Sequence, residues 1–578
     1  MKRDFQENQM ARYAIGLDYG TNSARSVIVD LDSGRELATQ VFSYPHGEAG
    51  ILLDQGDPNV ARQHPRDYID ATIDIVTGAV NAARDAEPGF SPDDIIGIGI
   101  DTTGSTPIPV DKTGKPLALI PEFKDNLSAM AWLWKDHTGH EEAALITETA
   151  EKMRPQFLAK CGGTYSSEWF WSKILHCKNT APGVFEAAYS FVEHCDYMPA
   201  LLAGDTDPLH IVHSVCAAGH KAMYCEEWGG LPDTEFLKTV DPSLADLRRR
   251  LYTKAVPADH CAGRLSDEWA DKLGLKPGTA IAAGAFDAHM GAAGAGIREG
   301  VLVKILGTST CDMMIWPNNR KLADIKGVCG IVDGSIVPGF YGIEAGQSAV
   351  GDIFLWFVNH LVPDRYGTGI DEKFSGLAEA AAGSSPGEHG LLALDWNNGN
   401  RNILTDPRLS GLLVGQTLHT EAHEIYRALI EATAFGALTI IKRIEEYGIQ
   451  VDEIINCGGL AVKNPLLMQI YADVTGRPMK VSRSEQTCAL GAAIFGAVAA
   501  GKEAGGFTDV SEAREAVCGV RDEIFTPAAE NREVYGNMYT LYRELHDAFG
   551  TEEWSGNPAR VMKELITIRE KQRGKKDA

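Results

Sequence analysis

The chain has 578 residues, of which 44% are hydrophobic and 23% charged, with a formal net charge of −25. This length exceeds what a single hydrophobic core supports, so we expect two large domains. The acidic balance disfavours nucleic acid and anionic membranes as partners, and no apolar run is long enough to cross a bilayer. The 11 dispersed cysteines include no CxxC pair, which fits reduced thiols in a cytoplasmic protein better than a disulfide scaffold or a zinc site.

The first predicted element is a β-hairpin with glycine and hydroxyl residues at its tip. Two apolar runs, residues 14–18 and 26–30, flank this tip. The tip residues are Gly20, Thr21 and Ser23. Such a tip exposes backbone N–H and hydroxyl donors that can wrap a phosphate. Asp18 ends the first run, where its carboxylate either holds Mg²⁺ through water or caps its own turn.

Helical and strand-like patterns alternate after this hairpin. Residues 67–84 carry apolar side chains at helical spacing, and residues 95–101 form a buried strand pattern that ends in an acid. This order predicts an α/β domain with a partly parallel sheet. Residues 120–270 are less periodic and rich in Trp, Gly and Pro, which indicates insertions that shape a pocket.

The pattern restarts near residue 280. Residues 279–287 predict a strand that ends at Asp287 among small neighbours. These neighbours leave room for a substrate hydroxyl within hydrogen-bonding reach, which is the geometric condition for a general base. His289 is either a structural histidine or a ligand.

A second hairpin of the same kind spans residues 302–315. Its tip residues are Gly307, Thr308 and Ser309. Two such tips on one chain predict two related lobes that close on one nucleotide, and they favour the metal role of Asp18 over the capping role.

The C-terminal part begins with a long predicted helix over residues 421–447. A strand then runs into Gly458 and Gly459, where a ligand can press against the backbone at a helix N-terminus. Residues 488–501 predict a close-packed helix that supports this turn. The last 60 or so residues look helical, and residues 569–578 form a charged, solvated tail.

These motifs together resemble the FGGY family of carbohydrate kinases over nearly the whole chain. The stretches shared across the family are residues 16–21, 284–287, 307–310 and 457–459. A second set resembles one branch of the family, whose substrate is a ketopentose; it consists of residues 101–107, 133–138, 165–173, 218–221 and 344–348.

The resemblance implies an α/β fold with two actin-like, ribonuclease H-like domains and a catalytic cleft between them. The expected divisions are a sugar-binding domain over residues 1–282, a nucleotide-binding domain over residues 283–510, and C-terminal helices with a charged tail over residues 511–578. It also implies ATP and Mg²⁺, direct in-line phosphoryl transfer to a sugar hydroxyl, and a tendency toward homodimers.

Site residues follow from the resemblance position by position. Asp287 would deprotonate the terminal O5 hydroxyl, and Asp18 would lie near Mg²⁺. The residues expected to bind the nucleotide are Gly20, Thr21, Ser23, Gly307, Thr308, Ser309, Gly458, Gly459, Lys463 and Asn464. Those expected to bind the sugar are Gly104, Asp136, Lys221 and Glu344.

Several alternatives stay open at this stage. Lys221 could be a surface lysine, and Asp136 could merely pair with Lys135. Two positions depart from the family pattern, with His176 in place of a tryptophan and Lys463 in place of an asparagine near adenine. Rival functions are a sibling kinase for another ketopentose or a pentitol, a non-catalytic actin-like sensor, and a chaperone-type ATPase.

Overall fold

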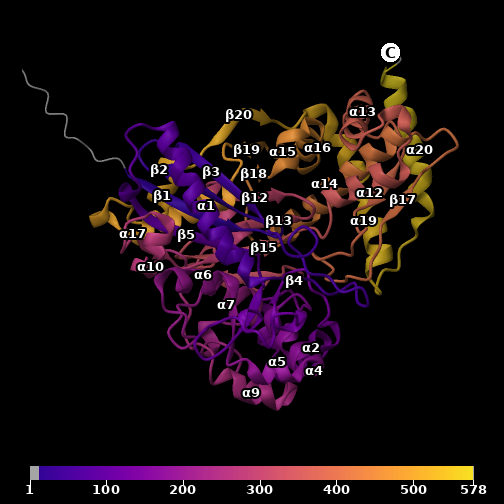
Figure 1. Ribbon diagram of the computed structural model, residues 1–578. Helices are drawn as coiled ribbons and strands as arrows, with labels where there is room; N and C mark the ends of the chain where they lie inside the picture. Colours follow the sequence, from indigo (N-terminus) through magenta and orange to yellow (C-terminus); the bar gives the residue numbers. More distant parts are fainter. Residues whose placement is uncertain (1–11, 577–578) are drawn as a thin grey trace, which may run out of the picture.

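The computed structural model describes residues 12–576, and each of its two lobes is built on a mixed seven-stranded sheet (Figure 1). The first sheet has the order β3-β2-β1-β5-β10-β9, with β11 paired to β5. Its strands are β1 (Tyr13–Tyr19), β2 (Ser23–Asp30), β3 (Glu36–Ser43), β5 (Ile95–Thr102), β9 (Cys261–Arg264), β10 (Ala280–Ala282) and β11 (Ala285–Phe286).

The second sheet has the order β14-β15-β13-β12-β18-β19-β20. Its strands are β12 (Val301–Leu306), β13 (Thr310–Pro317), β14 (Gly330–Asp333), β15 (Phe340–Ala345), β18 (Glu453–Cys457), β19 (Met479–Ser482) and β20 (Val520–Phe525). In both sheets an antiparallel hairpin, β1–β2 or β12–β13, pairs through its first strand with a parallel strand, β5 or β18. The two predicted hairpins therefore occupy equivalent places in two related sheets.

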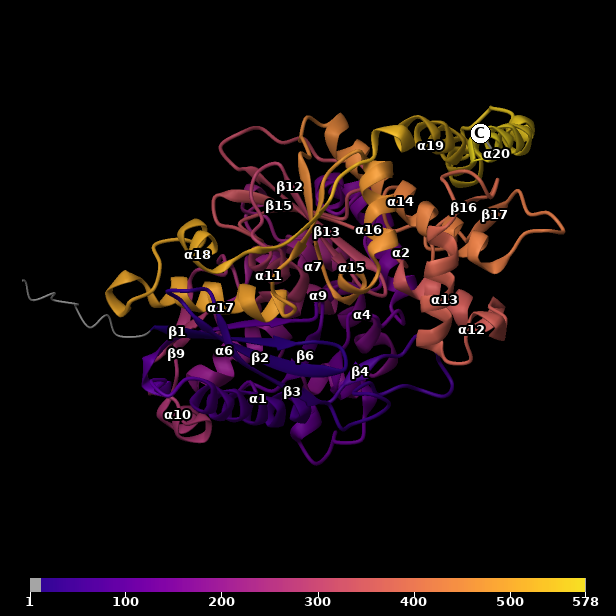
Figure 2. The ribbon, with the colours of Figure 1, turned by 90° about the horizontal axis from the view of Figure 1, so that it is seen from above.

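Two helices lie between the sheets, α11 (Asp287–Gly294) and α17 (Thr487–Ala500). Glycines let the backbone of α17 pack directly on the first sheet: a Cβ on Gly99 would lie 1.7 Å from the Ala492 carbonyl oxygen. A Cβ on Gly491 would lie 1.8 Å from the Met290 carbonyl oxygen in α11. Figure 2 shows α17 alongside β1, with α1 (Pro65–Ala86) on the other side of that sheet.

The predicted insertions between residues 120 and 270 form a helical layer with its own hydrophobic core at the bottom of Figure 1. Its helices include α2 (His140–Met153), α4 (Phe170–Thr180) and α7 (Val215–Ala222), whereas α6 (His194–Ala203) packs on the first sheet. The second lobe is completed by α12 (Gly351–Leu361), α13 (Ile370–Ala382), α14 (Ala422–Glu446), α16 (Pro465–Thr475), α19 (Ala529–Gly550) and α20 (Val561–Lys576). The charged tail is helical as far as residue 576, and residues 577–578 lie outside the described part.

Two predicted elements differ in detail from the structure. The strand expected over residues 279–287 is split into β10 and β11, because Gly284 packs so closely on Cys195 that a Cβ would lie 2.0 Å from its carbonyl oxygen. Asp287 consequently begins α11 rather than ending a strand. The helix after Gly458 is broken at Pro465, where Asn464 caps α16. No helix in residues 12–576 is long and apolar enough to span a membrane.

Candidate active site

Three aspartates lie at the ends of neighbouring strands in the first sheet. Asp18 in β1 pairs in parallel register with Asp101 in β5. Asp101 pairs in turn with Ala285 of β11, two residues before Asp287. Asp101 was predicted to end a strand and to begin a stretch that resembles one branch of the family, but it was not predicted as a site residue, because its neighbours depend on strand order and register.

The electrostatics of this cluster are those of crowded, buried acids. Burial, and then the negative charge of Asp18, raise the pKa of Asp287 to about 7 from an ordinary value of 3.8. Burial also raises the pKa of Asp18, although Arg25 opposes the shift with its Nε 3.4 Å from Oδ2. Asp287 is partly exposed, so this carboxyl group is accessible and titrates near neutral pH.

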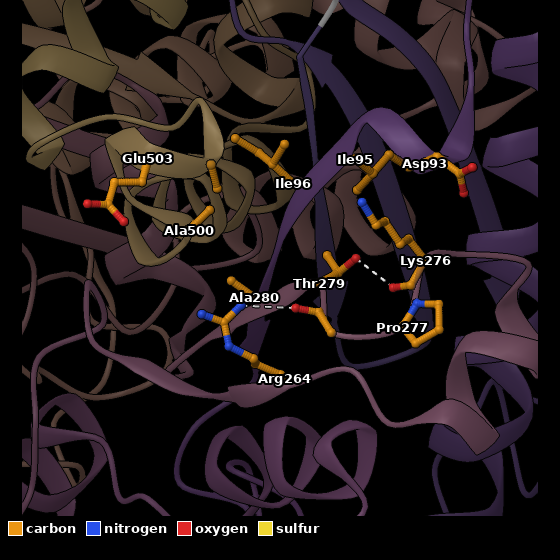
Figure 3. Close-up of a pocket in the computed structure, with 12 residues that line it drawn as sticks. Asp93, Ile95, Ile96, Arg264, Lys276, Pro277, Thr279, Ala280, Ala500 and Glu503 are labelled. Carbon is orange, nitrogen blue, oxygen red and sulfur yellow. Dashed lines mark hydrogen bonds between the residues drawn. The ribbon is translucent and has the colours of Figure 1, made fainter.

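A separate hollow of about 420 Å³ lies at the opposite end of β5 (Figure 3). Ile95 and Ile96, which begin β5, line it together with Arg264, Lys276 and Glu503. Because β5 runs from this hollow to Asp101, and a strand rises roughly 3.3 Å per residue, the hollow is distant from the three aspartates.

The tip of the first hairpin lies beside Asp18. The Gly20 N–H donates to the Ser23 carbonyl at 3.0 Å, and Trp134 Nε1 donates to Thr21 Oγ1 at 3.0 Å. Arg25 Nη2 donates to Ser23 Oγ at 3.4 Å. Arg25 was not predicted as a site residue; the structure adds it as a cation between the hairpin tip and the acids.

The second hairpin tip is exposed at Gly307 and Thr308 and held from behind by the residues that follow β15. Val350 and Gly351 donate backbone hydrogen bonds to the carbonyls of Thr308 and Gly307 at 2.8 and 3.1 Å. Gly458 lies against this hairpin with a φ of 93°, and a Cβ there would be 2.4 Å from the Leu306 carbonyl oxygen. The turn at Gly458 therefore lies next to the hairpin tip at Gly307.

The remaining residues predicted to bind the nucleotide differ in exposure. They are Ser309, Gly459, Lys463 and Asn464. Gly459 and Lys463 are exposed, and Ser309 is partly exposed. Asn464 is buried: its Oδ1 accepts from Leu467 N at 3.0 Å, and its Nδ2 donates to the Tyr426 hydroxyl at 3.1 Å. The side chain of Asn464 is therefore engaged within the protein.

Lys221 and Glu344, predicted to bind sugar, form a buried ion pair. Lys221 Nζ lies 3.1 and 3.3 Å from the two Glu344 oxygens. The ammonium also lies 5.7 Å from the ring centroid of Phe286, the residue before Asp287. A Cβ on Gly104 would lie 1.9 Å from the same ring, so Gly104 packs beside this pair. Lys221 is not a surface lysine.

His220 and His289 complete the surroundings of Glu344. His220 Nδ1 and His289 Nε2 lie 3.2 and 3.7 Å from Glu344 Oε2. Two imidazoles and a carboxylate are donors that zinc accepts, but the Lys221 ammonium already neutralises Glu344 and would repel a divalent ion. Burial by itself would raise the pKa of Glu344. The positive charge of Lys221 is the main influence that opposes burial, and the pKa of Glu344 lies well below its ordinary value as a result.

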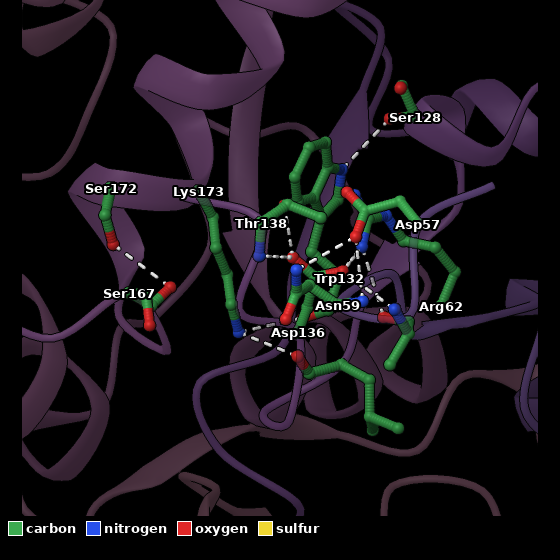
Figure 4. A network of polar contacts seen from close by, with 12 residues as sticks. Asp57, Asn59, Arg62, Ser128, Trp132, Asp136, Thr138, Ser167, Ser172 and Lys173 are labelled. Carbon is green, nitrogen blue, oxygen red and sulfur yellow. Dashed lines mark hydrogen bonds and ion pairs between the residues drawn. The ribbon is translucent and has the colours of Figure 1, made fainter. Parts of the chain in front are cut away.

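Asp136 lies in a buried polar network beside this region (Figure 4). Its carboxylate forms an ion pair with Arg62 and accepts hydrogen bonds from Ala61 N at 2.8 Å and Thr138 Oγ1 at 2.6 Å. Asp136 therefore pairs with Arg62 rather than with Lys135. It is fully buried.

Lys173 enters the same network and holds the chain next to Gly104. Its ammonium is buried and donates to the carbonyls of Ser105 and Leu133, each at 2.8 Å. Through Ser105 and Leu133 it thereby ties the loop after β5 to the loop that carries Asp136.

Sequence profiles of one family match most of the chain. The profile described as FGGY family of carbohydrate kinases, N-terminal domain, matches residues 13–294, and the corresponding C-terminal domain matches residues 302–500. A ribulokinase from Geobacillus thermodenitrificans is 43% identical over 96% of this chain and 99% of its own length. A ribulokinase from Shouchella clausii is 44% identical over 98% of this chain and 99% of its own length.

Solved structures of sugar kinases have the same fold. Xylulose kinase from Rhodospirillum rubrum covers 93% of this chain and 99% of its own, with a TM-score of 0.74 and 21% identity. Plasmodium falciparum glycerol kinase with ADP covers 93% of this chain and 98% of its own, with a TM-score of 0.73 and 17% identity. At these identities the likeness concerns the fold alone, and it confirms the predicted α/β architecture with two actin-like domains.

Proposed function

This chain belongs to the FGGY family of carbohydrate kinases, and from that premise we propose that it is a ribulokinase. It transfers the γ-phosphate of ATP to O5 of L-ribulose, giving L-ribulose 5-phosphate and ADP, as a step of L-arabinose breakdown. The observation that carries this proposal is the 43–44% identity to ribulokinases over nearly the full length of the chain. Other FGGY substrates, namely D-ribulose, L-xylulose or a pentitol, are the alternatives that the assays must separate.

Asp287 acts in this proposal as the general base. A carboxylate with a pKa of about 7 is deprotonated often enough at neutral pH to work, and basic enough to accept a proton from a hydroxyl as the phosphoryl group arrives. The O5 hydroxyl approaches the exposed edge of Asp287 while Lys221 and Glu344 exchange their mutual contact for sugar hydroxyls. Gly104 lets the Phe286 ring pack directly against the loop after β5, where that loop faces the sugar. Asp136 supports this wall from inside the protein.

The two hairpin tips hold the phosphates of ATP. The N–H groups of Gly20 and Gly307 close the two turns by donating to the Ser23 and Ser309 carbonyls, each at 3.0 Å. The donors to the phosphates are therefore the hydroxyls and remaining backbone N–H groups of the tips, at Thr21, Ser23, Thr308 and Ser309. Gly458 and Gly459 let the nucleotide lie against the backbone, and Lys463 lies at the adenosine side. Asn464 fixes α16 behind the nucleotide. Closure of the lobes excludes water, so that the phosphoryl group passes to sugar instead of being hydrolysed.

The acids also fit a divalent cation. Asp18 and Asp101 present oxygen ligands, which suit Mg²⁺. Within the described part of the chain, Arg25 is the cation paired with Asp18, and no lysine or arginine forms a salt bridge with Asp101. We assign Asp18 to Mg²⁺ through water. When bound, Mg²⁺ neutralises part of the phosphate charge that develops during transfer. We further propose a cytoplasmic enzyme that forms a homodimer.

The product identifies the reaction. Purified protein incubated with ATP, Mg²⁺ and L-ribulose is expected to yield ADP and a sugar phosphate whose ³¹P–¹H coupling places the phosphate on C5. ATP hydrolysis without a sugar phosphate, or phosphate on C1, would contradict the proposal. A control without sugar measures the background ATPase.

A further inference from the structure

Asp101 is a buried acid with no hydrogen-bond donor. Its side chain is 0% exposed, and neither carboxyl oxygen accepts a hydrogen bond from an N–H or O–H donor. Among the buried side-chain atoms of residues 12–576, these are the only carboxyl oxygens in that condition. An ionised carboxylate is costly to bury, and no N–H or O–H group of the described residues donates to Asp101 to stabilise that form.

The nearest polar neighbour of Asp101 is another acid. Asp18 is its cross-strand partner, and the two carboxyl groups contact one another. Residues paired directly in adjacent strands point to the same face of a sheet, so both carboxyl groups face the α17 side. Cys488 lies on that side, and burial followed by the charges of Asp18, Asp101 and Asp287 raises the pKa of its thiol. Three acids thus lie close to Cys488 at the start of α17.

The protein offers little positive charge to this region. Arg25 Nε is 3.4 Å from Asp18 Oδ2, but no salt bridge joins any described lysine, arginine or histidine to Asp101. The N-terminus of α17, which begins at Thr487, contributes only the roughly half-unit charge of a helix end. One arginine and a helix end do not balance three carboxyl groups.

We propose that Asp101 joins Asp18 in holding the divalent cation that accompanies ATP. Two facing carboxyl groups with free oxygens are the hard donor set that Mg²⁺ and Mn²⁺ accept, whereas zinc and copper prefer imidazole or thiolate. The inference rests on the proposed function, since the cation serves the nucleotide. The sequence motif predicted only Asp18 as a cation ligand. The structure adds Asp101, because it pairs with Asp18 across adjacent strands and its oxygens accept no N–H or O–H hydrogen bond.

The test measures cation binding without catalysis. Mn²⁺ is titrated into nucleotide-free and ADP-bound protein, and free Mn²⁺ is followed by electron paramagnetic resonance. Asp101→Asn keeps the shape of the side chain and removes its charge, so we expect the Mn²⁺ dissociation constant to rise at least about tenfold. Asp101→Ser is measured in parallel and is expected to show the same loss.

A matched control separates the cation site from general effects of changing a buried acid. Asp196 is also buried in the first lobe, but its oxygens are bound by His213 and by Ser214 N, each at 2.8 Å. Asp196→Asn should lose thermal stability and keep the wild-type Mn²⁺ affinity. Asp101→Asn, measured in EDTA, should unfold at the same or a higher temperature than wild type, because an amide replaces a buried carboxyl group that accepts no N–H or O–H hydrogen bond.

The outcomes distinguish this inference from the proposed function. Wild-type Mn²⁺ affinity in Asp101→Asn, within about twofold, would overturn the role of Asp101 even if L-ribulose is phosphorylated. Failure of both neutral variants to fold would assign the carboxylate to stability and overturn it as well. Loss of Mn²⁺ binding in the variants would support the cation role of Asp101 even if wild type proved inactive on L-ribulose. That inactivity would contradict only the proposed function.

Discussion

The rate of phosphoryl transfer should rise with pH through about 7, because Asp287 must be deprotonated to accept the O5 proton. Its pKa is raised to about 7 by burial and by Asp18, so the deprotonated fraction is about 9% at pH 6 and about 91% at pH 8. With both substrates well below saturation, kcat/KM should therefore increase roughly tenfold over this interval. A carboxyl group at the ordinary value of 3.8 would give a flat profile between these pH values.

The assay quantifies ADP directly by chromatography, since coupling enzymes have pH profiles of their own. Circular dichroism at each pH shows that the protein stays folded. Asp287→Asn should bind sugar but lose several orders of magnitude in kcat at every pH. A flat wild-type profile from pH 6 to 8, or more than about a tenth of kcat in the variant, would refute the reasoning.

Three further predictions concern buried lysines. Lys221→Met leaves the Glu344 carboxylate without its cation and removes a sugar ligand, so the KM for sugar should rise roughly thirtyfold, equivalent to about 2 kcal/mol, while the KM for ATP stays constant; an unchanged sugar KM in steady-state kinetics would be inconsistent with this. Lys173→Met removes the ammonium that donates to the Ser105 and Leu133 carbonyls, so the KM for sugar should increase with little change in kcat. Lys173→Arg should restore part of the loss. Equal increases in the KM for sugar and the KM for ATP would point to a general folding defect. Lys304→Met leaves the buried Asp312 carboxylate without its cation, since its two oxygens lie 2.7 and 2.9 Å from Lys304 Nζ. Urea unfolding should show that the free energy of unfolding falls by about 3–5 kcal/mol, and that the double variant Lys304→Met/Asp312→Leu largely recovers it. No recovery would show that the loss of stability has another origin.

Local patterns were sufficient to predict the main elements of the fold. The helix expected over residues 67–84 is α1, Pro65–Ala86, and the one expected over residues 421–447 is α14, Ala422–Glu446. Both are long and strongly periodic, so their apolar faces identify them without tertiary information. The two hairpins with glycine and hydroxyl residues at their tips were equally predictable, because each hairpin pairs strands that are adjacent in the chain.

Contacts between distant segments could not be predicted in the same way. Asp136 was weighed against its neighbour Lys135, but its partner is Arg62, which reaches it through the pairing of β4 (Arg62–Gln63) with β7 (Ala131–Trp132). The importance of Asp101 depends on the parallel register of β1 and β5, which no local pattern specifies. Asn464 has a capping bond that becomes visible only once the helix break at Pro465 is known.

The most direct measurement of the central claim is the specificity of the wild-type enzyme across a panel of sugars. L-ribulose, D-ribulose, L-xylulose, ribitol and L-arabinitol are compared by ADP release at pH 8, where Asp287 is largely deprotonated. We expect kcat/KM to be highest for L-ribulose, with weaker activity on epimers that differ in one hydroxyl. A higher value for any other sugar, or no sugar-dependent ADP release at all, would contradict the account.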